Sequence, residues 1–172
     1  MLRKLVLVAV ACATSVVMFA GPASALTKVR YQAQLSDHVA FTGFCDFTVY
    51  STDTGTAPMI TETYDDEGNL IRVDVTPQGW VQTTLEGNGN SVTVNNTGPV
   101  TIIFEADGTL TVYQRGPSLT GDQGLITGVA FLTHTYGRVV TTGVPNASTG
   151  LTDFTSVVWI GNVTDLCEAL AA

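Results

Sequence analysis

The sequence predicts an all-β fold, a single antiparallel β-sandwich or barrel of about ten strands. Three observations carry this prediction. Apolar and polar residues alternate with a period of two in several segments. Thr, Val and Gly are abundant, and no Ala, Leu, Lys and Glu run at helical spacing occurs before the last few residues. Turn signals such as Pro77-Gln78-Gly79 and Thr97-Gly98-Pro99 recur at regular intervals. The periodicity does not distinguish a closed barrel from two packed sheets.

Residues 1–25 have the order of a secretory signal peptide. Two basic residues precede an apolar segment, which is followed by a Gly-Pro pair and by the small residues Ala23-Ser24-Ala25. The apolar segment is shorter than the roughly 20 residues of a membrane-spanning helix. We therefore expect cleavage after Ala25, a single secreted domain over residues 26–172, and no transmembrane helix in the mature chain.

The net charge argues against some classes of binding partner. The chain has 15 acidic and 7 basic residues, and Arg3 and Lys4 belong to the signal peptide, so the mature chain carries 5 minus 15, or −10. Such a chain repels polyanions, which makes nucleic acids and anionic lipids poor candidates as partners. We expect a cell-wall glycan or another extracellular protein instead.

Five segments show the strand alternation. In residues 28–35, four apolar side chains alternate with polar ones, which predicts a half-buried strand. Two longer stretches, Gly116–Gly124 and Gly143–Asp153, are expected to be loops, where a binding site would lie. The expected inward residues are Val29, Tyr31, Ala33 and Leu35; Ile71, Val73 and Val75; Val81 and Leu85; Val92 and Val94; and Val100, Ile102 and Phe104.

Two acidic stretches have the same spacing. TYDDEGNL (63–70) and IFEADGTL (103–110) each place an aromatic residue, acidic residues, a glycine and a leucine at equal positions. A short hairpin loop needs a residue with positive φ where these glycines stand. A calcium loop would need oxygen ligands at alternating positions and a distal bidentate Glu, which neither stretch has. We predict hairpin turns and no metal site.

Catalytic signals are sparse. No GxSxG, HExxH or SxxK motif occurs, and neither phosphate-binding loops nor closely spaced zinc ligands are present. We expect no cofactor. His38, beside Ser36 and Asp37 in an expected loop, and His134, in an expected strand, are interpreted as surface or packed imidazoles. An acidic pair for glycoside hydrolysis stays open, because the spatial separation of the carboxylates decides it.

Trp80 is the candidate ligand-binding residue. It opens an expected strand whose inward residues are Val81 and Leu85, which places it on the outer face. An exposed Trp among polar groups can stack on a sugar ring, and covering the end of a sandwich is the alternative. Trp159 lies in an apolar segment and is expected in the core.

Two cysteines remain when Cys12 leaves with the signal peptide. In an oxidising compartment, Cys45 and Cys167 are expected to form a disulfide. The bond would close a loop of over a hundred residues and stabilise the fold by about 4 to 5 kcal/mol. A catalytic or metal role is the alternative, but no CxxC motif occurs and no His lies near either cysteine.

The cysteine contexts resemble those of a group of small secreted actinobacterial proteins of unknown function. Here the early C-x-F context is Cys45-Asp46-Phe47, and the terminal V-x-D-x-C-x-x-L segment is Val163–Leu170. The resemblance covers most of the chain from about Phe44 onward. It implies a shared fold, export and pairing of the two cysteines, and it transfers no catalytic residues.

Taken together, these features predict a secreted, non-enzymatic extracellular or cell-envelope protein that binds a partner or is structural. Two alternatives remain. One is a secreted hydrolase that uses an acidic pair. The other is a secreted protease inhibitor whose bait loop would be Gly116–Gly124 or Gly143–Asp153.

Overall fold

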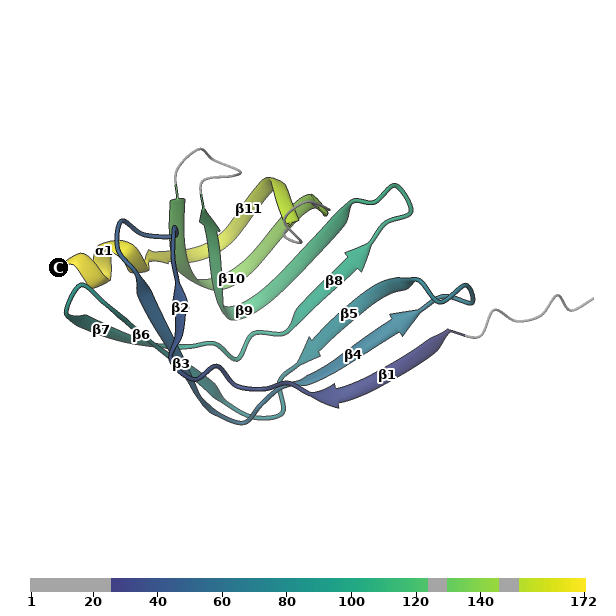
Figure 1. Ribbon diagram of the computed structural model, residues 1–172, viewed down its shortest axis with the longest axis horizontal. Helices are drawn as coiled ribbons and strands as arrows, with labels where there is room; N and C mark the ends of the chain where they lie inside the picture. The colour runs from purple at the N-terminus through teal and green to yellow at the C-terminus, as the bar shows by residue number, and fades with distance from the viewer. Residues whose placement is uncertain (1–25, 124–129, 146–151) are drawn as a thin grey trace, which may run out of the picture.

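The computed structural model describes residues 26–123, 130–145 and 152–172, which form eleven strands and one helix (Figure 1). The all-β prediction is confirmed. The signal peptide prediction falls on residues 1–25, outside the described residues. The elements are β1 (Thr27–Gln32), β2 (Val39–Phe41), β3 (Val49–Gly55), β4 (Met59–Tyr64), β5 (Leu70–Thr76), β6 (Val81–Gly87), β7 (Asn90–Asn95), β8 (Val100–Phe104), β9 (Leu110–Gln123), β10 (Ala130–Pro145), β11 (Thr152–Asp165) and α1 (Leu166–Ala171).

The described strands form two antiparallel sheets. One has seven strands in the order β1-β4-β5-β8-β9-β10-β11, and the other has four in the order β2-β3-β6-β7. The chain passes between the sheets through the connectors 33–38, 56–58, 77–80 and 96–99. Three of them contain a proline, namely Pro58, Pro77 and Pro99. Because proline donates no hydrogen bond to a ladder, these positions end the strands and separate the sheets.

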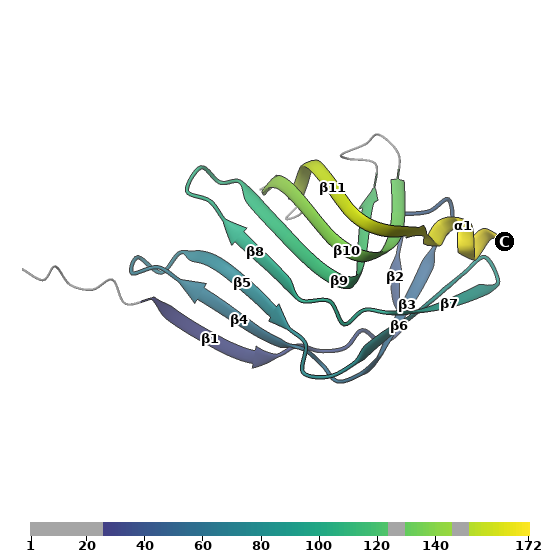
Figure 2. The ribbon, with the colours of Figure 1, turned by 180° about the vertical axis from the view of Figure 1, so that it is seen from behind.

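A row of glycines bends the three longest strands. Gly116 of β9 pairs with Gly137 of β10, which pairs with Gly161 of β11. A Cβ at Gly137 would lie 2.0 Å from the carbonyl oxygen of Ile160, so only glycine fits there. We call this row the corner. It divides each strand into an outer arm (110–115, 138–145 and 152–160) and an inner arm (117–123, 130–136 and 162–165), and the bend is visible in β9 and β10 (Figure 2).

The core lies between the four-stranded sheet, the inner arms and α1. Val49 of β3, Leu85 of β6 and Leu132 of β10 pack with Leu166 and Leu170 of the helix, and none of the five is more than 6% exposed. The inward positions expected for β6 are therefore confirmed. Partly buried aromatic and aliphatic side chains extend the cluster: Phe41, Phe44, Phe47, Val92, Val94 and Leu119.

The C-terminal helix is fixed to this core by its cap and by the disulfide. The Asp165 side chain accepts a hydrogen bond from the backbone N–H of Glu168 (3.1 Å), which caps the first turn. Cys167 is bonded to Cys45, with 5.5 Å between the Cα atoms, as predicted. The bond is consistent with an oxidising compartment. Within the described ranges, no helix has the length and apolar character needed to cross a membrane.

Strands β1, β5 and β8 of the seven-stranded sheet, called here the outer strands, are far less covered by other parts of the chain. All six residues of β1 are exposed, and Val29 and Tyr31 are each 44% exposed. The expectation of a half-buried first strand is wrong, because β1 is a sheet edge and pairs only with β4. Val73 of β5 and Ile102 of β8 are half-buried.

Both acidic stretches are hairpin turns, as predicted. The N–H of Asp65 donates to the carbonyl of Asn69 (3.0 Å), and the N–H of Glu105 donates to that of Thr109 (2.8 Å). Gly68 and Gly108 have φ values of 86° and 83°. The equal spacing in the sequence therefore reflects two copies of the same loop geometry.

The two predicted loops are not confirmed. Residues 116–123 continue β9 through the corner, and the residues at both ends of Gly143–Asp153 belong to β10 and β11. Residue 124 and residues 146–151 lie outside the described residues. Glycine and proline at the start of the first stretch make a bend inside a strand, which the pattern alone does not distinguish from a loop. A bait loop over Gly116–Gly124 is therefore excluded for residues 116–123.

Candidate functional site

The basic residues of the described chain all lie on one face of the seven-stranded sheet. Directly paired residues share a face, and so do residues two apart along a strand. Lys28 pairs with Thr63, and Thr63 pairs with Arg72. Arg72 pairs with Ile103, which pairs with Thr111. Arg115 lies four residues beyond Thr111 and shares its face. The face, called here the cationic face, carries Lys28, Arg30, Arg72, Arg115 and Arg138.

Arg115 and Arg138 are direct cross-strand partners. Like charges at opposite positions of a ladder destabilise a sheet. Among the described residues, no carboxylate lies within 4.0 Å of either guanidinium. Arg138 lies over the ring of Tyr113, 5.7 Å from its centroid, a distance typical of a cation–π contact. Two exposed, uncompensated cations thus stand side by side in a chain with a large excess of acids.

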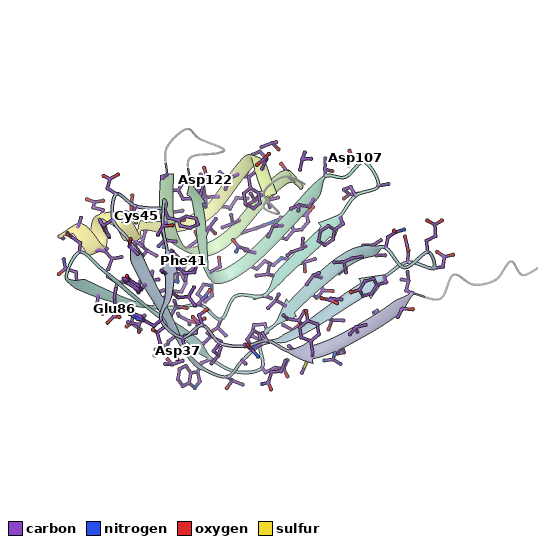
Figure 3. All side chains as sticks on the ribbon, viewed as in Figure 1. Asp37, Phe41, Cys45, Glu86, Asp107 and Asp122 are labelled. Atoms are coloured by element: carbon purple, nitrogen blue, oxygen red, sulfur yellow. A yellow bond between two sulfur atoms is a disulfide. The ribbon has the colours of Figure 1, made fainter. Side chains whose placement is uncertain are left out.

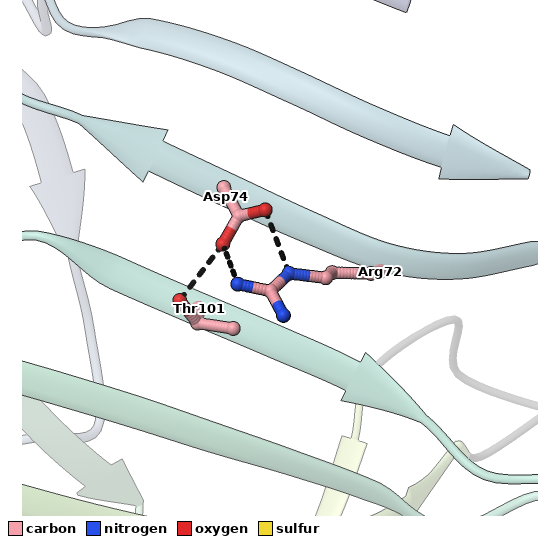
Figure 4. A network of polar contacts seen from close by, with 3 residues as sticks. All are labelled: Arg72, Asp74 and Thr101. Carbon is pink, nitrogen blue, oxygen red and sulfur yellow. Dashed lines mark hydrogen bonds and ion pairs between the residues drawn. The ribbon is translucent and has the colours of Figure 1, made fainter. Parts of the chain in front are cut away.

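Arg72 is already paired. Its Nε and Nη2 donate to the two carboxylate oxygens of Asp74, each at 2.7 Å, and the Thr101 hydroxyl donates to the same carboxylate at 2.9 Å (Figure 4). The hydrogen bonds from Arg72 are the main reason that the pKa of Asp74 lies below its ordinary value, and the charge of Lys28 adds to the effect. Asp74 therefore stays ionised and compensates Arg72, which leaves Arg115 and Arg138 as the available cations.

A cavity of about 300 Å³ lies between Arg72 and Arg115, and Arg138 stands beside it without lining it. Guanidinium groups bind carboxylates and phosphates through two parallel N–H bonds. An oxyanion in this cavity would meet Arg115 directly, and the phenol of Tyr113 would be available to its other polar atoms. The Thr101 hydroxyl already donates to Asp74 and can only accept. The lining residues are Arg72, Pro99, Thr101, Ile103, Tyr113 and Arg115.

Trp80 lies at the junction of the sheets, in the connector between β5 and β6. It is 57% exposed, as the sequence indicates. Its carbonyl accepts the N–H of Thr56 (2.9 Å), and its ring lies against Gly55, where an added Cβ would come within 2.8 Å of it. Trp80 is thus held in place but belongs to no strand of the cationic face.

The two histidines lie apart from the cationic cavity. His38 stacks on Tyr50 with 4.5 Å between ring centroids, and its Nδ1 lies 3.8 Å from a carboxylate oxygen of Glu86. His134 is 5% exposed, and its Nε2 lies 2.7 Å from the carbonyl oxygen of Asn95. His134 therefore joins an inner arm to the strand end at β7, which agrees with a packed imidazole.

Two other acidic sites lie apart from the cationic cavity. Asp107 lies at the tip of the β8–β9 turn, at the opposite end of the molecule from Cys45 (Figure 3). On the other face of the sheet, the phenols of Tyr31 and Tyr64 donate to the two oxygens of Glu62 (2.7 and 2.6 Å). These bonds lower the pKa of Glu62, with Tyr64 the larger cause. Within the described part of the chain, no group of three His, Cys, Asp or Glu side chains is arranged to hold a metal ion.

Comparisons of the chain with protein-family models, with curated proteins and with solved structures find no match. The sequence predicted the disulfide and the exposure of Trp80, but it did not indicate that Arg72, Arg115 and Arg138 share one face. Their separation along the chain hides their proximity. The alternation of Lys28 and Arg30 on one strand was the only local signal that one face of the sheet is basic.

Proposed function

We propose that the protein is an exported, non-enzymatic binding protein whose cationic face attaches to an anionic polysaccharide of the cell envelope or its surroundings. The carboxylate or phosphate groups of such a polymer are the shared chemistry that it recognises. The observation that carries the proposal is the Arg115–Arg138 pair, which is adjacent, exposed and without a carboxylate partner.

The energetic cost of the arginine pair supports a ligand role. Two facing cations repel, and a nearby acid would relieve the repulsion, as Asp74 does for Arg72. The chain has 15 acidic residues, yet none lies at this pair. An anionic group that bridges the two guanidiniums would supply the missing charge on binding.

The charge distribution favours a sparsely charged polymer over a nucleic acid. Nucleic acids carry a phosphate at every nucleotide, and a protein must neutralise several of them at once. Here the cationic face holds five basic residues, one of them paired with Asp74, on a domain whose overall charge is strongly negative. A polysaccharide with one charge per repeat of several sugars would present single anionic groups to the cavity beside Arg115, and its neutral hydroxyls could contact Tyr113 and Thr101.

Export and the disulfide agree with this assignment. The signal-like residues 1–25 and the resemblance to small secreted proteins predict an extracellular or cell-wall location. The Cys45–Cys167 bond is consistent with an oxidising compartment.

The test is affinity electrophoresis of the mature protein in gels that contain polygalacturonate, poly(glycerol phosphate), neutral dextran or duplex DNA. The first two polymers distinguish carboxylate from phosphate as the recognised group. The variant is Arg115→Gln with Arg138→Gln. The matched control is Lys28→Gln with Arg30→Gln, which removes the same charge from the same face at β1, away from the cavity.

We expect at least one anionic polymer to retard the wild type and the control, and the arginine variant to lose this retardation by tenfold or more in affinity. The effect should weaken with added salt. No retardation in any gel would overturn the proposal, and so would equal loss in the variant and the control. Stronger retardation by DNA would exclude the polysaccharide. Retardation by dextran that is lost in Trp80→Ala would instead assign neutral glycan binding to Trp80.

A further inference from the structure

A second cavity lies inside the corner, on the opposite, concave face of the seven-stranded sheet. Gln114 of the outer arm of β9 reaches across the bend to its inner arm. Its Nε2 donates to the carbonyl oxygen of Leu119 (3.1 Å), and its Oε1 accepts the hydroxyl of Thr120 (2.6 Å). The bend therefore brings the two arms of β9 together, and a cavity of about 130 Å³ that is partly open to solvent lies between them.

The lining of this corner cavity is mostly apolar and carries no ionisable side chain. Val112 and Val157 come from the outer arms of β9 and β11, and Phe131 comes from the inner arm of β10. The ring of Phe131 also meets the indole of Trp159 edge to face, with 5.4 Å between centroids. A few polar groups among apolar and aromatic walls are typical of sites for small organic ligands.

Three buried polar atoms on the same face, outside the lining of the cavity, have no hydrogen-bond partner among the described residues. They are the hydroxyls of Ser118 and Thr135 and the indole N–H of Trp159. Ser118 and Thr135 pair directly across β9 and β10 and are 2% and 0% exposed. Gln114 pairs with Val139, which pairs with Trp159, so the three atoms share the face of Gln114. A buried polar atom without a partner is uncommon in folded proteins, and an indole N–H can only donate.

The composition of the lining selects against anions. A negative ligand in the corner cavity would find no cation among the lining residues. Asp122 lies on the same face of the inner arm of β9, directly opposite Phe131, and is 2% exposed. Its position at the upper end of the inner arm is seen in Figure 3.

We propose that the corner cavity binds a small uncharged organic molecule, with an apolar ring or short alkyl body and one oxygen that accepts a hydrogen bond. The volume sets the size, since an apolar cavity of about 150 Å³ accommodates a benzene ring. The apolar walls bind the body, and the polar side chains of the lining, Gln114, Thr120 and Thr141, provide the partners for the oxygen. The site is separate from the cationic face and does not depend on the function proposed for it.

The probe is 4-fluoroacetophenone, a neutral aromatic ketone whose ring would occupy the cavity while its substituents extend through the open side, and binding is followed by ¹⁹F NMR. The variant Val157→Phe fills the cavity. The matched control is Val158→Phe, which makes the same change one residue along β11, where the side chain is 52% exposed on the other face. The anion 4-fluorobenzoate tests the charge selection.

We expect a saturable shift of the ketone with the wild type and with Val158→Phe, and a loss of affinity of at least tenfold with Val157→Phe. The benzoate should bind at least tenfold more weakly than the ketone. Equal binding by all three proteins, or a shift that never saturates, would overturn the proposal. Preferred binding of the benzoate, lost in Arg115→Gln with Arg138→Gln, would assign the signal to the cationic face.

A second measurement does not depend on whether Val157→Phe folds. Trp80→Phe leaves Trp159 as the single tryptophan. Because Phe131 both lines the cavity and contacts Trp159, the bound ketone should quench or shift the Trp159 emission with the same saturation curve as the NMR signal. An emission spectrum that does not change at saturating ketone would contradict binding at the corner.

Discussion

The inner arms and the outer strands of the seven-stranded sheet both carry large apolar residues but have very different surroundings. Leu132 of an inner arm is 6% exposed and packs on the four-stranded sheet and α1. Ile102 of β8 has the same apolar character but is only half-buried, and Val29 of β1 is 44% exposed. The difference teaches that alternation in a strand specifies a potential inner face, and that the second layer decides whether this face is buried.

The same division separates stability from binding. The buried leucines, the disulfide and the capped helix lie together at one end. The cationic face belongs to the other, less covered region. A rigid core that supports an exposed sheet is a common arrangement for a binding surface.

Removal of the disulfide should have the largest effect. By loop entropy, a cross-link that spans 122 residues stabilises by about 5 kcal/mol. We expect Cys45→Ala with Cys167→Ala to lose most of this free energy of unfolding in urea, because the bond holds α1 in the core. A loss below about 1 kcal/mol would show that packing alone fixes the helix.

The corner should tolerate no side chain. Gly137→Ala places a Cβ 2.0 Å from the carbonyl oxygen of Ile160, and the overlap is with backbone that cannot turn away. We expect a loss of about 3 kcal/mol or more, measured by thermal and urea unfolding. Gly108→Asn is the control, because Asn adopts positive φ and nothing lies within 4 Å of that site. Equal losses in both variants would refute the close contact.

A matched pair of truncations tests the comparison directly. Leu85→Ala removes a side chain that is fully buried and should cost about 3 kcal/mol. Ile102→Ala removes one of similar size from the half-covered region and should cost about 1 kcal/mol. Similar losses in urea unfolding would mean that the outer strands are covered in solution.

The smallest expected effect is the loss of stability at low pH, when Asp74 becomes protonated and its ion pair with Arg72 is lost. The pKa of Asp74 is lowered by Arg72, so the pair contributes stability above the ordinary pKa of an aspartate, about 4, and loses it as the pH falls through the lowered value. The side chains are 28% and 49% exposed, which limits the contribution to less than about 1 kcal/mol. Asp74→Asn should flatten the stability curve below pH 4 by this amount, and an unchanged curve would contradict it.

Several features were predictable from local pattern. The two hairpins follow from glycine after acidic residues, and the disulfide follows from two cysteines in an expected export context. The bend at Gly116 was mistaken for a loop because glycine and proline occur in both. Gly116 is part of a corner because Gly137 pairs with it and Gly161 pairs with Gly137, and these pairs form only in the folded sheet.

The sequence by itself determined the all-β class, the two acidic hairpin turns, the acidic net charge and the exposure of Trp80, because each depends on composition or on neighbours in the chain. Only the tertiary structure decided where the few cations lie. Arg72, Arg115 and Arg138 are far apart in sequence, and strand pairing brings them to one face. Antiparallel register is a long-range property, so the candidate binding site appears only when the strands are paired.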